Sequence, residues 1–207
     1  MLKFLITAGP TREYLDPVRF LTNGSTGKMG YACVDAALAK GHQVTLVTGP
    51  VSITPPTGID TTHVSTTEEM ADAVFRHYDQ CDVVIKTAAP CDYRPAYPSN
   101  SKIKKGPGHF VAKFESTTDI LAELGRRKTR QILIGFAVED ENAQDNARRK
   151  LKEKNLDAIV LNSPASFASD TADFQILLPD GQSQQLPTTN KSNLAAILIE
   201  LAKKLHS

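Results

Sequence analysis

Short strand-like segments alternate with helix-forming segments along most of this chain. Apolar segments typical of buried strands lie at residues 2–7, 43–48, 82–87, 131–137 and 157–161, with a further short strand expected near 61–65. Helical patterns lie at residues 27–40, 66–78, 117–127 and 139–154. Strands that alternate with helices form a parallel sheet with helices on its faces. The alternation therefore predicts an α/β fold with a mostly parallel sheet.

The C-terminal part has a different pattern. Pro179, Asp180 and Gly181 separate two short strand-like segments, residues 174–178 and 184–186. Asp-Gly is a common turn in antiparallel hairpins, and residues 190–205 read as a closing amphipathic helix. No repeat or linker interrupts the chain. We therefore expect one domain over residues 1–207, Rossmann-like and doubly wound, with an antiparallel C-terminal hairpin added to the sheet.

Composition excludes several classes of protein. The 207 residues carry 24 Lys and Arg against 23 Asp and Glu, a net charge of +1, whereas a general nucleic-acid binder has a clear basic excess. The 3 cysteines form no C-x-x-C pair, which favours a reducing compartment over a disulfide framework or a zinc site. No signal peptide or membrane span is evident. We expect a cytoplasmic protein that binds neither nucleic acid nor a membrane.

A Gly- and Ser-rich turn leads into the first helix. In open parallel sheets, ligands bind at the carboxyl ends of the strands. The first strand is followed by Gly9 and, after an intervening segment, by Ser25 and Gly27. Backbone N–H groups at a helix start bind anions, so this turn is a candidate phosphate site. An ordinary turn before a capped helix fits the same residues.

Two known nucleotide fingerprints are not met here. The dinucleotide pattern G-x-G-x-x-G fails because the glycines stand at 24, 27 and 30. The P-loop pattern fails because only two residues separate Gly24 from Gly27, and Met29 rather than Ser or Thr follows Lys28. A standard dehydrogenase or NTPase is therefore disfavoured.

A long segment at about residues 88–109 contains four prolines, two glycines and the cluster Lys102, Lys104 and Lys105. Loops of this length are usually functional. The lysines are either a solvated face or cations that close over a polyphosphate. Asp92 is a candidate for a metal or a ribose, or an ordinary turn residue. The histidines show no metal-ligand spacing, and no nucleophile motif is present, which favours catalysis by positioning and charge neutralisation.

Several segments resemble phosphopantothenoylcysteine synthetase, the second half of a bifunctional flavoprotein in many bacteria. The resemblance rests on Ile6–Glu13, Asp16–Asn23, Ser25–Gly30, Ala88–Ala89, Asp92–Pro95, Lys102–Lys105, Gly135–Ala137 with Glu139, and Lys154–Asp157. These segments follow one another in the family order over almost the whole chain. The Asn23 segment and the Lys102 cluster together make the resemblance specific.

The resemblance implies a ligase that joins 4′-phosphopantothenate to cysteine in two steps. CTP, with Mg²⁺, activates the carboxylate as an acyl-cytidylate and releases pyrophosphate; the cysteine amine then forms the amide and releases CMP. The bacterial style of the motifs favours CTP over ATP. The resemblance also implies a homodimer, in which the 88–109 segment reaches across the two-fold axis. It further implies a decarboxylase as a partner, fused or separate. No flavin is expected in this chain.

The resemblance also implies roles for individual residues. Lys102 neutralises charge in the first step, Asn23 holds the acyl-nucleotide for the second, and Arg19 lies four residues before it. The implied nucleotide-binding residues are Gly9, Thr11, Ser25, Gly27, Asp92, Lys102, Phe136, Ala137, Lys154 and Asn162. The implied substrate-binding residues are Asn23, Arg19, Ala88 and Ala89. Mg²⁺ is held mainly by the phosphates, with Asp92 as a weak ligand, and backbone groups near Phe136, Ala137 and Asn162 read the base.

Two positions depart from the family pattern, and two other functions stay open. Pro90-Cys91 replaces a more ordinary pair, and Gly24 stands where a His is typical. A Rossmann-type reductase that binds NAD(P) or a flavin would have the same order of elements. A nucleotide-binding module without turnover is the third alternative.

Overall fold

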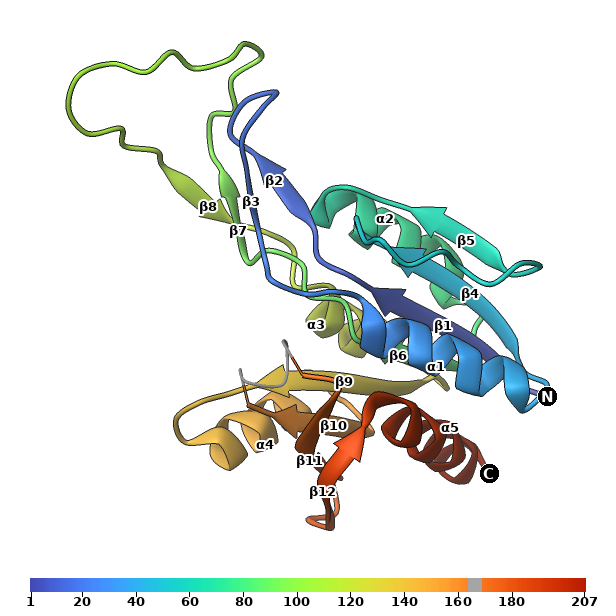
Figure 1. Cartoon of the computed structure of the whole chain (residues 1–207). Coiled ribbons are helices and arrows are strands. Elements are labelled where there is room, and N and C mark those ends of the chain that lie inside the picture. The colour runs from blue at the N-terminus through green and yellow to red at the C-terminus, as the bar shows by residue number, and fades with distance from the viewer. Residues whose placement is uncertain (164–168) are drawn as a thin grey trace.

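The computed structural model describes residues 1–163 and 169–207. Its centre is an eight-stranded sheet in the order β12-β11-β10-β9-β6-β1-β4-β5 (Figure 1). The strands are β1 (Lys3–Ala8), β4 (Gln43–Thr48), β5 (Asp60–His63), β6 (Val83–Lys86), β9 (Ile132–Val138), β10 (Ala158–Asn162), β11 (Thr171–Leu177) and β12 (Ser183–Asn190). Within this sheet β5, β4, β1, β6, β9 and β10 are mutually parallel, whereas β11 pairs antiparallel with both β10 and β12. The predicted fold class is confirmed.

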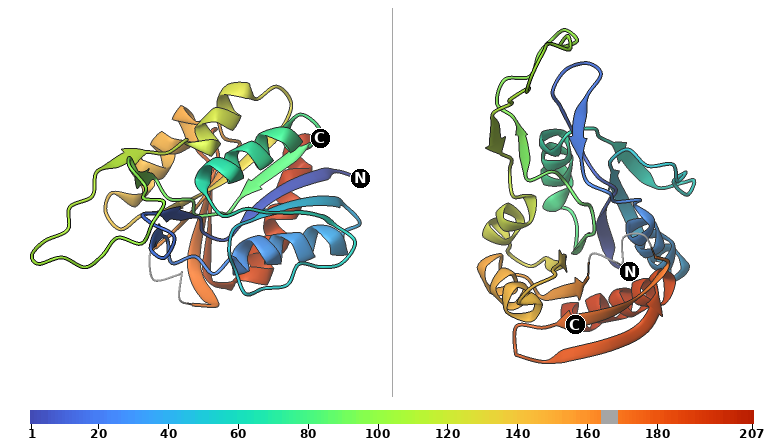
Figure 2. Two further views of the ribbon diagram at one scale, coloured as in Figure 1. Left: turned by 90° about the horizontal axis from the view of Figure 1, so that it is seen from above. Right: turned by 60° about the vertical axis from the view of Figure 1, so that its left-hand side comes forward.

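Helices cover both faces of this sheet (Figures 1 and 2). On one face, α1 (Lys28–Ala39) and α5 (Lys191–His206) pack against a core that includes Phe4 and Ile6. On the other, α2 (Thr67–Tyr78), α3 (Ile120–Arg127) and α4 (Ala143–Glu153) pack against a core that includes Leu5. Successive side chains of a strand point to opposite faces, so the apolar residues of β1 contribute to both cores.

Two helix ends carry the capping residues that the sequence predicts. Gly41, with a φ of +73°, follows the end of α1 in the left-handed conformation. Thr66 and Glu69 form a reciprocal capping box at the start of α2. Two helices begin later than the sequence pattern predicts: Asp119 caps α3, which starts at Ile120, and α4 starts at Ala143.

Two small ladders project from the body and were not predicted. The first pairs β2 (Arg12–Tyr14) with β3 (Phe20–Thr22), and the second pairs β7 (Tyr93–Pro95) with β8 (Phe114–Ser116). Together with the segments that join their strands, they extend from one end of the molecule, and we call residues 12–22 and 93–116 the arm (Figure 2). The 88–109 segment is therefore not a plain loop throughout, because β7 lies inside it.

The outer strand β12 is irregular. Its pairing with β11 shifts register between Ala172 and Phe174, and it contains Pro187, which has no N–H to donate. Thr188 has a φ of +43°, and its N–H donates to the side chain of Asp173 at 2.7 Å.

Among the residues described, no helix has the length and apolar character to cross a membrane.

Candidate functional site

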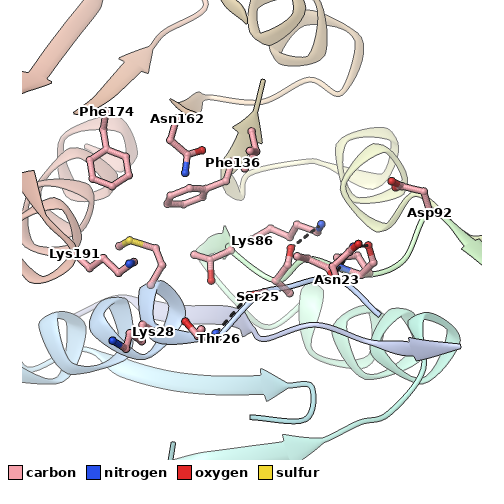
Figure 3. A pocket seen from close by; sticks show the side chains of 17 residues that line it. Asn23, Ser25, Thr26, Lys28, Lys86, Asp92, Phe136, Asn162, Phe174 and Lys191 are labelled. Atoms are coloured by element: carbon pink, nitrogen blue, oxygen red, sulfur yellow. Dashed lines mark hydrogen bonds between the residues drawn. The ribbon is translucent and has the colours of Figure 1, made fainter. Parts of the chain in front are cut away.

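A cavity of about 280 Å³ lies at the carboxyl ends of β1, β6, β9 and β10. Its position follows the rule for open parallel sheets. Part of its lining comes from residues singled out in the sequence, namely Asn23, Ser25, Gly27, Ala88, Ala89, Asp92, Phe136 and Asn162. Figure 3 shows the side chains of Asn23, Phe136 and Asn162 around this space, although they come from segments that are far apart in the chain. The structure therefore brings the predicted turn, the loop after β6 and the ends of β9 and β10 around one space.

The start of α1 forms one side of this cavity. Gly27 occupies the N-cap position with a φ of +79°, and no side chain caps the helix. The first-turn N–H groups of an uncapped helix point toward any ligand at that end. Gly30 lets α1 approach the sheet, since a Cβ there would lie 2.5 Å from the Cβ of Ala8. This geometry suits a phosphate group.

Asn23 connects the turn to the loop after β6. Its side-chain amide donates to the carbonyl oxygens of Ala89 at 3.2 Å and Pro90 at 2.9 Å. Both partners line the cavity with it. Pro90, the first residue of the unusual Pro90-Cys91 pair, is thus part of the wall of the site, and Cys91 is buried behind it.

A cluster of charged side chains, which sequence reasoning missed apart from Lys154 and Asp92, lies around Lys86. Burial, followed by the nearby charge of Lys154, lowers the pKa of Lys86 to about 8, while Asp119 and Asp92 act in the opposite direction. Lys154 donates to Asp119 across 2.6 Å, and the charge of Lys150 also lowers the pKa of Lys86. The sequence signal that could have pointed to this cluster is Lys86 itself, a charged residue at the end of the otherwise apolar strand β6.

The opposite end of the cavity from Asp92 carries two further lysines (Figure 3). Lys28 and Lys191 both line it, beside Phe174. Lys28 forms an ion pair with Asp170 at 2.6 Å, and Lys191 donates to the carbonyl oxygen of Ser169. Burial lowers the pKa of Lys191. In the sequence, Lys28 belongs to an unmet P-loop pattern and to the Ser25–Gly30 segment, and Lys191 has no signal beyond its place at the start of the last helix.

Arg19 and Lys102 lie in the arm and do not line this cavity. The Arg19 guanidinium donates to the carbonyl oxygen of Ile103 at 2.7 Å, and a second cavity is lined by Arg19 and residues 103–110. Within the described part of one chain, the structure does not bring Arg19 and Lys102 together with Asn23. Their predicted roles therefore need either movement of the arm or a second copy of the chain.

Other predicted residues lie beside or behind the cavity wall. Thr11 is fully buried and bonds Thr67 through its hydroxyl at 2.9 Å, and Ala137 is buried against the opposite face. Gly9 lies next to Gly27, whose added Cβ would be 3.5 Å from the Gly9 nitrogen. Burial raises the pKa of the Cys91 thiol, which argues against a thiolate nucleophile.

No group of three or more His, Cys, Asp or Glu side chains that could hold a metal ion occurs in residues 1–163 and 169–207. Asp92 is exposed and lies at the cavity edge. Mg²⁺ usually binds one or two carboxylates together with substrate phosphates. The side chains present fit an ion that arrives with a nucleotide rather than a resident metal.

Comparison with known proteins gives one consistent family. The family described as DNA/pantothenate metabolism flavoprotein C-terminal domain matches residues 1–205. The coenzyme A biosynthesis bifunctional protein CoaBC of Bacillus subtilis is 46% identical over 204 residues, which cover 96% of this chain and 50% of that protein. The crystal structure of the C-terminal domain of a protein with this name has a TM-score of 0.85 and 42% identity, covering 99% of this chain and 95% of that one.

A further relative has a different name. The cysteine/cysteine sulfinic acid decarboxylase of an unknown prokaryotic organism is 42% identical over 95% of this chain and 56% of its own length. The chain spans about half the length of the curated relatives it matches.

Proposed function

This chain belongs to the family of the DNA/pantothenate metabolism flavoprotein C-terminal domain, and we propose that it is the ligase that joins 4′-phosphopantothenate to cysteine in coenzyme A biosynthesis. The observation that carries the proposal is the cavity itself. It combines an uncapped helix start, the amide of Asn23 and the half-buried side chain of Lys86. These groups suit two anionic reactants better than they suit acid–base chemistry.

The nucleotide is CTP, and it lies between the start of α1 and the ends of β9 and β10. The base packs against Phe136 and is read by backbone groups near Asn162. The N–H groups at Ser25 and Gly27 bind phosphate oxygens, and Lys86 and Lys154 neutralise the polyphosphate from the opposite wall. Mg²⁺ supplies further charge neutralisation when bound to the phosphates, and Asp92 is the residue of this chain that would hold it.

The first step joins the substrate carboxylate to the α-phosphate of CTP. A carboxylate oxygen attacks phosphorus, the bond to pyrophosphate breaks, and an acyl-cytidylate forms. Two anions approach each other here, so the step depends on nearby positive charge more than on a base. Lys102 supplies that charge, and Arg19 binds the anionic substrate beside Ala88 and Ala89.

The second step forms the amide. The cysteine amine attacks the acyl carbon, CMP leaves, and the amine loses a proton. The Asn23 amide lies beside the acyl group, where it donates a hydrogen bond to the acyl-nucleotide and orients the incoming amine. In the free protein the same N–H groups bond the carbonyls of Ala89 and Pro90, so the donor is already directed at the wall that the substrate occupies.

The active unit is a homodimer in which the arms meet. The arm exposes a set of apolar side chains, namely Tyr14, Val18, Phe20, Leu21, Tyr93, Tyr97, Phe110, Val111 and Phe114. Exposed apolar patches of this kind mark contact surfaces. Pairing of two arms would cover these side chains and bring Arg19 and Lys102 of one copy to the cavity of the other. The ligase works in the cytoplasm with a decarboxylase, fused or separate, that takes its product.

The decisive experiment adds CTP, Mg²⁺, 4′-phosphopantothenate and cysteine to the purified protein and measures pyrophosphate and amide product. We expect both, with a higher kcat/KM for CTP than for ATP. A reductase would instead oxidise NADPH, a decarboxylase would release CO₂ without using CTP, and a binding module would bind CTP without turnover. Any of these three results would replace the proposed function.

A further inference from the structure

Asn23 is followed by glycine, and it is the one Asn-Gly pair in the sequence. In such a pair the backbone nitrogen of the glycine can attack the asparagine side chain, because glycine has no Cβ to obstruct the approach. Every other asparagine here precedes a residue with a side chain. Asn23 is also the residue placed above at the reacting centre.

The local structure leaves this pair open. Asn23 and Gly24 are both exposed, and a Cβ built on Gly24 would meet no atom within 4 Å. The pair lies between the end of β3 and the start of α1, outside any helix or strand. The surroundings of Gly24 therefore leave room for its nitrogen to reach the side-chain carbon of Asn23 once the Asn23 amide releases the carbonyl oxygens of Ala89 and Pro90.

We propose that Asn23 is a site of spontaneous deamidation, which converts the active centre with time. The Gly24 nitrogen bonds to the Asn23 side-chain carbon and loses its proton, and the Nδ2 group leaves as ammonia. The resulting five-membered succinimide is opened by water at either carbonyl, giving aspartate or isoaspartate at position 23. One water is consumed and one ammonia released, and no oxidant or cofactor is needed.

The products alter the contacts of the site. A carboxylate cannot donate to the carbonyl oxygens of Ala89 and Pro90, which now receive the Asn23 N–H groups. Isoaspartate also adds a carbon to the main chain directly before the Ser25–Gly27 turn. The chemistry at Asn23 is independent of the proposed function, whereas its effect on turnover rests on that function.

The test is a time course of the folded protein held at mildly alkaline pH and then digested for mass spectrometry. Asn100 is the internal control, because it is also exposed but precedes Ser101. We expect Asn23 to convert at least about tenfold faster than Asn100, which corresponds to a barrier lower by about 1.4 kcal/mol. An isoaspartyl-specific methyltransferase should label the aged protein at position 23. Equal rates at the two sites would overturn the proposal.

Gly24→Ala is the matched variant, because its methyl group has open space and should leave the fold intact by circular dichroism. Its conversion at Asn23 should fall to the rate at Asn100. If Gly24→Ala converts as fast as the parent, the Gly24 nitrogen is not the nucleophile and the proposal is wrong. Loss of activity in step with deamidation would then test the role of Asn23; unchanged activity in fully deamidated protein would refute that role and leave the modification site standing.

Discussion

The buried carboxylate of Asp16 accepts a hydrogen bond from the backbone nitrogen of Ile103 at 3.1 Å. The same carboxylate accepts from the backbone nitrogens of Val18 and Arg19, each at 2.8 Å. One side chain thus closes the tip of the β2–β3 hairpin and anchors the segment that begins at Lys102. Burial raises the pKa of Asp16, but these N–H donors and the charge of Arg19 bring it below the usual value.

We predict that Asp16→Ala releases the Lys102–Lys105 segment from the hairpin. Trypsin should cut after these lysines several times faster than in the parent, and pyrophosphate formation should fall. Because the pKa of Asp16 is lowered, the charged carboxylate keeps accepting from these N–H groups at neutral pH, and it loses its charge only as the pH falls through that lowered pKa. The segment should therefore also loosen as the pH falls through that pKa, which hydrogen exchange of its backbone amides can follow in acid, where trypsin is inactive. Asp72→Ala, an exposed change on α2, should alter neither rate.

Lys102→Gln should block formation of the acyl-nucleotide and leave the fold unchanged, because the side chain is exposed. Removing one group that stabilises developing charge typically costs about 10²–10³ in rate. Pyrophosphate release and thermal unfolding measure the two effects. Lys113→Gln removes an exposed lysine from the same arm and should retain activity. Near-normal release by Lys102→Gln would exclude Lys102 from the first step.

Asn23→Asp should separate the two half-reactions. Aspartate has nearly the same size, but it replaces a donor with a negative charge beside an anionic intermediate. The lost hydrogen bond alone costs about 1.5–3 kcal/mol, so amide formation should slow more than roughly tenfold. The acyl-cytidylate should then accumulate and be seen by quenching with labelled CTP. Equal slowing of both steps, or the same effect in Asn100→Asp, would assign Asn23 a binding or structural role.

Nucleotide binding should weaken as the pH rises through the pKa of Lys86, about 8. Below that pH the ammonium group is charged and attracts phosphate; above it the charge is lost. The dissociation constant should increase by up to about tenfold for each pH unit above the pKa. Lys86→Met should bind CTP more weakly and lose this dependence, as titration calorimetry can measure. Lys203→Met, at the far end of α5, should behave like the parent.

Mixing two inactive variants tests whether the site is shared between copies. If Lys102 of one copy serves Asn23 of the other, a dimer of one Asn23→Asp chain and one Lys102→Gln chain contains one intact site. An equal mixture should then recover roughly a quarter of the parent's activity, the share expected for a two-fold dimer. Sedimentation would check that dimers form. Recovery no greater than the sum of the separate variants would place both residues in one chain.

Most of the main sheet could be predicted because its central strands are largely apolar and buried and are separated by clear helical patterns. The arm could not. Its strands have only three residues, and β3 and β8 are exposed throughout, so no alternation distinguishes them from loop. Their pairing depends on contacts such as Asp16 with Ile103, which no local window contains.

The candidate site was predictable where it follows strand ends. Asp92 is a candidate because it follows a strand, whereas Asn23 and Asn162 are implied by the family resemblance; all three line the cavity. The cluster around Lys86 was not found, because its members come from β6, the cap of α3 and the end of α4. Such a cluster exists only once the helices are packed.

The irregular edge strand β12 also bears on solubility. An exposed strand rich in Gln and Thr is a ready template for a second molecule, and sheets that join edge to edge grow into fibrils. Pro187 withholds a donor from that edge, and the backbone reversal at Thr188 turns it out of line. This edge therefore offers a second molecule an interrupted row of backbone donors, which disfavours extension of the sheet and leaves association to other surfaces.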